Sequence, residues 1–227
     1  MNKRKELLAL AKKRQATRWD GYNCIGDYHG GAYECDFVSP YTKTAGNVDA
    51  DIMVMLQDWW SDDGMSGLID PDSVTLGYGT TNRTDINLIR LLDKTFGLTL
   101  RDIYATNLFP FVKPGGMSAR IPTRDLVRAA REFALPQIRI VNPRLVICLG
   151  IDTFNALRRA CDLRPWDMKL PAAIESPFEI GGTRVWGQAH TATRGQNART
   201  NVLDDWLRMK ADYRRRLRRD RRNERKR

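Results

Sequence analysis

The chain lacks the features of several large protein classes. Its 227 residues include only four cysteines and two histidines. No two cysteines form a C-x-x-C pair, which argues against a structural zinc or iron–sulfur site, and a chain of this size does not depend on disulfides. No apolar run approaches the roughly 18 residues needed to cross a bilayer. We therefore expect a soluble protein with no metal site and no membrane contact.

Positive charge is concentrated at the two ends of the chain. Residues 1–19 hold seven Lys or Arg against one Glu, and residues 208–227 hold twelve against three acidic residues, whereas residues 20–207 carry a net charge of −4. We therefore divide the chain into a basic N-terminal helix (1–19), a central domain (20–207) and an Arg-rich helical extension (208–227). Such arms commonly bind phosphates, although a charged helix also serves simply to keep a protein in solution.

The start of the chain does not have the pattern of a secretion signal. A short apolar patch at residues 7–11 is followed at once by Lys12-Lys13-Arg14, and no cleavage site is evident. We expect a cytoplasmic protein, associated with the nucleoid if the source is bacterial.

Four short apolar runs predict a parallel sheet. Each leads through a loop into a helical pattern, which is typical of α/β proteins. The runs span residues 51–57, 103–109, 144–150 and 183–189, and the helical patterns begin at Thr84, Thr123, Asp152 and Asn201. We predict a three-layer α/β/α domain around a central, mainly parallel four-stranded sheet. Residues 20–47 and 61–83 are expected to be irregular.

Polar side chains stand at the ends of three of these runs. Gln57 and Asp58 end the first, Asn107 lies near the end of the second, and His190 follows the fourth. In open α/β sheets the ligand binds outside the carboxyl ends of the strands, so these side chains are expected to line one crevice. Each also has a structural alternative, because Asp58 and Asn107 suit turns and His190 suits the cap of a helix.

In their order along the chain, these residues resemble the motifs of the uracil-DNA glycosylase superfamily across residues 45–207. Residues 54–61 (VMLQDWWS) are similar to the G-Q-D-P-Y-H motif, and Asn107 falls on the Asn that reads the uracil edge. Residues 144–150 (RLVICLG) are similar to the P-x-x-I-x-x-L-G strand, and residues 189–194 (AHTATR) are similar to the H-P-S loop. The chain departs from the pattern at Leu56, Trp59-Trp60 and Thr191-Ala192, where the family has Gly, Pro-Tyr and Pro-Ser.

The resemblance implies a hydrolase that needs no cofactor and cleaves the bond between uracil and deoxyribose. Asp58 would face the sugar cation and orient the attacking water. Neutral His190 would donate to uracil O2, with backbone amides near Gln57 assisting. Asn107 would pair with uracil N3 and O4, an edge whose donors and acceptors cytosine inverts.

The resemblance also implies a flipped-out base and a basic surface around it. Tyr78 is similar in position to the family's stacking Phe, although its distance in sequence from Asp58 is longer than the family's. Trp60 falls where a Tyr would bar the thymine methyl, although an indole there also suits the core. Four cations would contact DNA: Arg194 at the position of the family's wedge leucine, and Lys113, Arg120 and Arg199 on a rim around the cleft.

Two alternatives to uracil excision remain open. The changes at Trp59-Trp60 and Thr191-Ala192 would suit a sibling glycosylase of broader scope, acting on xanthine, hypoxanthine or mismatched thymine. The second alternative is a non-enzymatic nucleic-acid binder of the same fold, and Asp58 argues against it. For either glycosylase we expect a monomer whose partner is DNA containing uracil or another damaged base.

Overall fold

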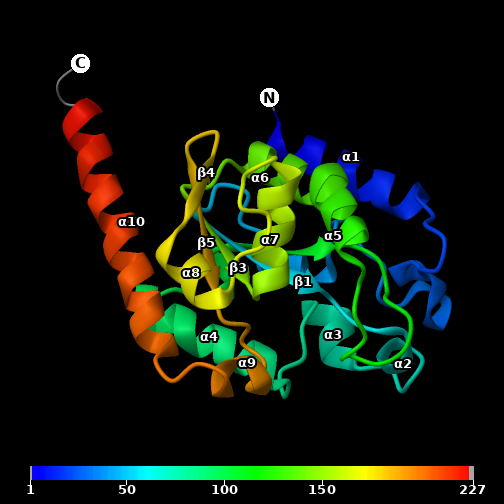
Figure 1. Cartoon of the computed structure of the whole chain (residues 1–227). Helices are drawn as coiled ribbons and strands as arrows, with labels where there is room; N and C mark the ends of the chain where they lie inside the picture. The colour runs from blue at the N-terminus through cyan, green and yellow to red at the C-terminus, as the bar shows by residue number, and fades with distance from the viewer. Residues whose placement is uncertain (1, 225–227) are drawn as a thin grey trace.

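A five-stranded sheet lies at the centre of the computed structural model, which describes residues 2–224 (Figure 1). The strand order is β2–β1–β3–β5–β4. The parallel strands are β1 (Ile52–Asp58), β2 (Tyr104–Phe109), β3 (Leu145–Leu149) and β5 (Thr183–Gln188), and β4 (Phe178–Ile180) pairs antiparallel with β5. The predicted α/β fold is confirmed, but the sheet has one strand more than predicted. The sequence does not reveal β4 because it has three residues and buries only Phe178.

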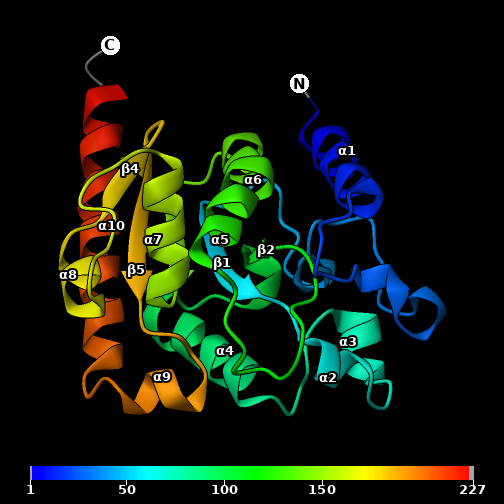
Figure 2. The same ribbon diagram turned by 45° about the vertical axis from the view of Figure 1, so that its right-hand side comes forward.

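Helices cover both faces of the sheet (Figures 1 and 2). One face carries α1 (Lys3–Ala16), α5 (Thr123–Ala129), α6 (Leu135–Val141) and α7 (Ile151–Ala160), with a π-helical turn at Ala130–Ala134 between α5 and α6. The other face carries α4 (Arg83–Phe96) and α10 (Val202–Glu224). The connections hold α2 (Asp62–Met65), α3 (Pro71–Leu76), α8 (Leu170–Glu175), α9 (Thr193–Asn197) and 3-10 turns at Ile25–Asp27, His29–Gly31, Pro40–Lys43 and Leu100–Asp102. The segment 61–83, expected to be irregular, therefore contains two short helices, of which α3 begins at Pro71 after the capping residue Asp70.

Within residues 2–224, none of the helices combines the length and the apolar character that a membrane span requires.

The central strands are apolar on both sides. Met53, Val54 and Met55 of β1 are all fully buried, as are Val146 and Ile147 of β3. Because helices cover both faces, a central strand has no solvent side on which to alternate polar residues. The sequence therefore shows continuous apolar runs, and polar residues begin only at the strand ends.

Capping residues set both ends of α4, and one of its side chains contacts the loop after β5. The side chain of Asn82 accepts a hydrogen bond from Thr84 N at 2.9 Å, and Gly97 ends the helix with a left-handed φ of 69°. The helix begins just before the predicted Thr84 because Asn82 is its cap. From the second turn, Asn87 Nδ2 donates to the Thr191 carbonyl at 2.9 Å.

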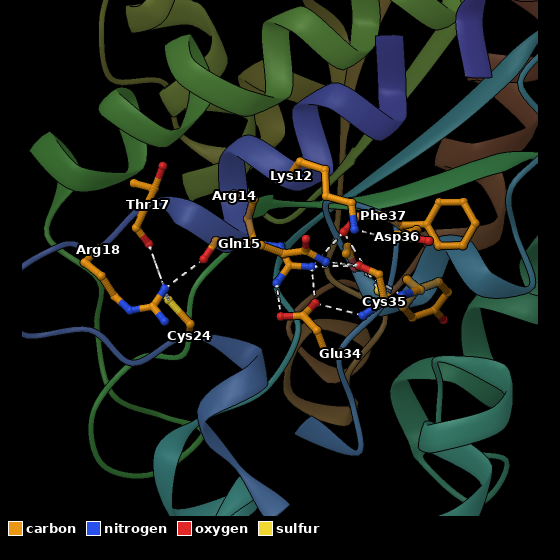
Figure 3. A network of polar contacts seen from close by, with 12 residues as sticks. Lys12, Arg14, Gln15, Thr17, Arg18, Cys24, Glu34, Cys35, Asp36 and Phe37 are labelled. Carbon is orange, nitrogen blue, oxygen red and sulfur yellow. Dashed lines mark hydrogen bonds and ion pairs between the residues drawn. The ribbon is translucent and has the colours of Figure 1, made fainter. Parts of the chain in front are cut away.

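The N-terminal helix α1 supports the irregular segment 20–47 (Figure 3). Arg14 is fully buried and donates to both carboxylate oxygens of Glu34 and to the carbonyls of Cys35 and Phe37. Five of the seven cations in residues 1–19 form ion pairs inside the protein, so few of them are free for phosphates. The other four pairs are Lys3–Asp49, Lys12–Asp36, Lys13–Glu132 and Arg18–Asp27.

Candidate active site

The carboxyl edge of the sheet gathers the main side chains of the predicted site. Asp58 is the last residue of β1, Asn107 lies in β2 opposite Leu56, and His190 follows the end of β5. Asp58 is close enough to His190 to influence the pKa of the imidazole electrostatically. Side chains that are far apart in the sequence therefore meet at one edge of the sheet.

Asp58 is buried in an ion pair with Lys113. The distance between Asp58 Oδ2 and Lys113 Nζ is 2.9 Å, and the side chains are 7% and 4% exposed respectively. Lys113 Nζ also donates to the Met117 carbonyl at 2.7 Å, and Gln57 Nε2 donates to Asp58 Oδ1 at 3.1 Å. Because both ions have lost their water, each depends on the other for charge compensation. The pair holds the carboxylate in one orientation at the end of β1.

Lys113 does not lie on the exposed basic rim predicted from the sequence. The segment after β2 turns back toward the end of β1. There Lys113 and Ser61 form an isolated parallel β-bridge, and the Lys113 carbonyl accepts a hydrogen bond from Asp62 N at 2.9 Å. This backbone contact directs the lysine inward to Asp58. Lys113 is therefore buried beside Asp58, and a contact with DNA phosphates stays a prediction.

Within residues 2–224, no three His, Cys, Asp or Glu side chains are grouped in a way that could hold a metal ion. Asp58, the carboxylate at the centre of the site, already binds the Lys113 ammonium.

His190 presents one N–H donor to the site. Burial lowers the pKa of its imidazole from 6.5; the Asp58 carboxylate opposes this effect, and the Lys113 ammonium adds to it. Ala192 N donates to His190 Nδ1 at 3.0 Å, so the neutral ring carries its hydrogen on Nε2. Gly195 allows the close turn that follows, because a Cβ there would lie 2.2 Å from the His190 carbonyl oxygen.

Asn107 has an amide group that is buried without a partner. The residue is 1% exposed, and its Oδ1 accepts a hydrogen bond from Ser39 Oγ at 2.5 Å. Its Nδ2 has no hydrogen-bond partner among the described residues. An unpaired buried donor costs about 1–3 kcal/mol and is rare in folded proteins. The Nδ2 group is therefore available to an acceptor atom of a ligand.

Ser39 is a site residue that the sequence did not reveal. Its hydroxyl accepts from Tyr41 N at 3.2 Å, which caps the 3-10 turn at Pro40–Lys43, and donates to Asn107 Oδ1 across 68 positions of sequence. The local signal, Ser39-Pro40, indicates only a turn. The contact with Asn107 depends on how the segment 20–47 packs against β2.

Trp60 is partly buried and packs against a small hydrophobic cluster. Its ring lies 5.5 Å from that of Trp59 and 5.8 Å from that of Tyr33, measured between centroids. It also lies against α2, where a Cβ on Gly64 would come within 1.9 Å of Trp60 Nε1. A direct role of Trp60 in substrate binding stays a prediction.

Tyr78 lies on the same side as Asn107. Its ring is 6.0 Å from that of Tyr41, which is two residues from Ser39, the hydrogen-bond partner of Asn107. Gly77 lies so close to the same segment that a Cβ would be 1.8 Å from the Pro40 carbonyl oxygen. Tyr78 is thus linked through Tyr41 to the segment of Ser39, whereas Trp60 stands two residues after Asp58; which of the two contacts the base stays a prediction.

The cations near the site differ in whether they already form an ion pair. Arg120 and Arg194 are exposed, and neither forms an ion pair with a described residue. Arg199 donates to both carboxylate oxygens of Asp205, at 2.7 and 2.9 Å, so its guanidinium is already engaged. A hollow of about 360 Å³ between α4 and the start of α10 is lined by Arg90, Lys94 and Arg199, and the first two were not identified from the sequence.

The chain has been compared with known protein families and with curated proteins. A family model described as Uracil DNA glycosylase superfamily matches residues 80–218, which is more than half of the chain. The matched range contains Asn107, Lys113 and His190 and begins after Asp58, where the chain departs from the family's first motif. No curated protein matches significantly. The chain therefore belongs to the uracil-DNA glycosylase superfamily and has the DNA glycosylase type of function that the family performs on DNA.

Proposed function

We propose that this protein is a monofunctional, monomeric uracil-DNA glycosylase that hydrolyses the N-glycosidic bond and leaves an abasic site. The observation that carries the proposal is the unpaired Nδ2 of buried Asn107, at the same sheet edge as a buried carboxylate and a neutral imidazole. A polar group buried without a partner is rare in folded proteins, and a ligand that accepts a hydrogen bond from Nδ2 would account for it here.

The departing base takes negative charge, and His190 is suited to receive it. The Nε2–H of the neutral ring can donate to uracil O2 as charge gathers on that oxygen. The donor is already oriented by the hydrogen bond from Ala192 N to Nδ1. A preorganised donor of this kind contributes about 2.7–4 kcal/mol in the transition state.

The sugar takes positive charge, and Asp58 is suited to act there. Lys113 engages Oδ2 of the carboxylate, so Oδ1, beside Gln57, is the oxygen that can accept a hydrogen bond from the attacking water. The water would be held between the carboxylate and the sugar carbon. Lys113 acts through Asp58 as a positioning residue, because it compensates the buried negative charge while no substrate is present.

Asn107 supports a preference for uracil over cytosine. With Oδ1 accepting from Ser39, the amide cannot turn over without losing that bond, so Nδ2 presents a donor. Uracil O4 is an acceptor and fits it, whereas the amino group of cytosine would set donor against donor. Sites that read a polar edge in this way discriminate by as much as about 10⁴–10⁵.

The base must leave the duplex to reach these groups. Tyr78 would stack on the flipped base, and exposed Arg194 on α9 would fill the gap in the duplex. Arg120, with Arg90 and Lys94 along the hollow beside α4, would contact phosphates. Arginine suits both tasks, because its planar guanidinium stacks on bases and binds phosphate oxygens in pairs.

The direct test is incubation of the purified protein with oligonucleotides that each contain one altered base, followed by alkali and measurement of strand breaks. We expect cleavage at uracil. The panel includes xanthine, hypoxanthine and thymine opposite guanine, and efficient cleavage at one of these with none at uracil would replace the proposal by the broader sibling activity. Cleavage of none of them would refute the glycosylase proposal.

Replacing Ser39 by Ala is expected to reduce kcat/KM for uracil by about tenfold, the scale of one lost buried hydrogen bond. Without the Ser39 hydroxyl, the amide of Asn107 can turn over and present its oxygen to uracil O4. Cleavage at cytosine should then rise relative to cleavage at uracil. Ser39→Thr keeps the hydroxyl and is the control. A Ser39→Ala protein with unchanged discrimination would show that Ser39 does not orient Asn107.

The pH profile should report the neutral state of His190. Because its pKa is below 6.5, the ring stays neutral down to that pH and gains a proton only as the pH falls further. A proton on Nδ1 would meet the N–H of Ala192 and displace the ring. We therefore expect kcat/KM to be flat from about pH 8 to about pH 6.5 and to fall below it. His190→Gln, which donates without titrating, should lose that acid limb; an acid limb that begins above pH 6.5 would contradict the assignment.

A further inference from the structure

One side of α10 carries a continuous row of exposed arginines. At 100° per residue, these side chains fall within an arc of about 140° around the helix. The opposite side packs on the domain through buried Trp206 and Met209. We call the exposed row the arginine face; it consists of Arg208, Arg214, Arg215, Arg218, Arg219 and Arg222.

The acidic residues around α10 neutralise only part of this face, in which Arg208 pairs with Glu175 at 3.9 Å and Arg215 pairs with Asp212. Asp220 pairs with Arg144 at 3.6 Å, and Glu179 pairs with Arg216 at 2.8 Å, on the side of the helix that faces the sheet. Asp212 is shared between Arg184 and Arg215, both at 3.3 Å. Within residues 2–224, the other members of the arginine face from residue 214 onward form no ion pair with a described side chain; these are Arg214, Arg218, Arg219 and Arg222.

From Arg214 onward, the arginine face lies toward the edge of the sheet opposite the candidate active site, whereas Arg208 lies near the carboxyl edge. Gln188, the last residue of β5, donates to the Asp205 carbonyl at 3.3 Å, whereas Arg216 donates to the carbonyl of Gly182, just before β5, at 3.4 Å. The helix therefore runs antiparallel to β5, from the carboxyl edge to the amino edge. Its 23 residues span about 35 Å, and its end projects past the β4–β5 hairpin (Figures 1 and 2).

We propose that the arginine face binds a second segment of duplex DNA, separate from the segment whose base enters the active site. The proposal rests on the proposed function only in taking DNA as the substrate of the other edge. Because α10 runs over about 35 Å from the carboxyl edge to the amino edge, its end lies outside the reach of one straight duplex that crosses the carboxyl edge.

Charge and shape favour DNA as the occupant. Unpaired guanidinium groups spaced along a helix match the phosphates that line a groove, and each contact releases a counterion. A helix that lies on a membrane needs a broad apolar side exposed to lipid. The apolar side of α10 is already used against the sheet and α4, where Trp206 and Met209 are fully buried.

The first test measures binding of undamaged duplex DNA over a range of salt concentrations. One protein carries Arg214→Gln, Arg218→Gln, Arg219→Gln and Arg222→Gln. The control removes the same charge at scattered exposed positions, with Arg4→Gln, Arg101→Gln, Arg139→Gln and Arg164→Gln. The slope of log K against log salt should flatten by about 3–4 in the first protein, because each lost phosphate contact removes about 0.9. Equal slopes in the two variants would overturn the proposal.

The second test asks whether the protein joins two duplexes. Undamaged duplex fixed to beads should capture a labelled free duplex when wild-type protein or the control variant is present, and not when the arginine-face variant is present. Binding without capture by the wild type would mean that both edges share one duplex, or that an acidic protein is the partner, and would overturn the proposal. Uracil excision by the wild type is scored separately, so a failed proposed function appears as absent cleavage and leaves the slope comparison intact.

Discussion

Uracil excision is expected to fall by about 10²- to 10³-fold when Asp58 is replaced by Asn. Asparagine has the same size and can keep the contact with Gln57, but it carries no negative charge for the sugar cation or for the proton of the attacking water. The single-turnover rate on a uracil-containing duplex measures this loss. Affinity for the same duplex, measured by fluorescence anisotropy, should stay within a fewfold of the wild type.

The control for this prediction is Asp63→Asn. Asp63 is an exposed residue of α2, close in sequence but outside the site, so its replacement should leave the rate unchanged. A folded Asp58→Asn protein with a rate near that of the wild type would remove Asp58 from the mechanism. The proposed chemistry at the sugar would then have no carboxylate.

Replacing Lys113 by Met is expected to lower the free energy of unfolding by about 3–5 kcal/mol. The variant leaves the Asp58 carboxylate buried without a cation, and breaking a buried pair on one side costs that much. Urea denaturation followed by tryptophan fluorescence measures the change. The double variant Asp58→Asn with Lys113→Met should recover most of the lost stability, because no charge is then left uncompensated.

Lys12→Met provides the matched control for Lys113→Met. Lys12 pairs with Asp36 at 2.8 Å, but both side chains are more than half exposed, so its loss should cost no more than about 1 kcal/mol. If Lys113→Met lowers the free energy of unfolding as little as Lys12→Met does, Asp58 and Lys113 do not form a buried, mutually compensating ion pair. If the double variant is less stable than Lys113→Met alone, the two charges do not compensate each other.

Features that are local in the sequence could be predicted. The apolar runs of β1, β2, β3 and β5 follow from burial on both faces, and Gly97 marks the end of α4 because glycine tolerates the left-handed conformation. The polar residues at the strand ends were visible for the same reason, since the apolar run stops where the sheet stops. The family could also be recognised from the sequence, because its motifs keep their order along the chain.

Features that depend on distant partners could not be predicted. The three-residue β4 exists because β5 provides an edge for it, and a segment so short has no pattern of its own. Lys113 was assigned to a basic rim because it stands on the Gly-Pro loop that follows β2. Nothing near it in the sequence shows that Asp58 lies 2.9 Å away. The contact from Ser39 to Asn107 is another case, since it joins a turn to a strand.

By itself, the sequence determined the four parallel strands and the main helices of this protein, the family to which it belongs and the residue types available for chemistry, because apolar period, capping and motif order are local properties. Only the tertiary structure decided which charges are compensated. It buried Lys113 against Asp58 and Arg14 against Glu34, and it directed the arginine face away from the site. The physical reason is that the energy of a charge depends on its neighbours in space and on its access to water.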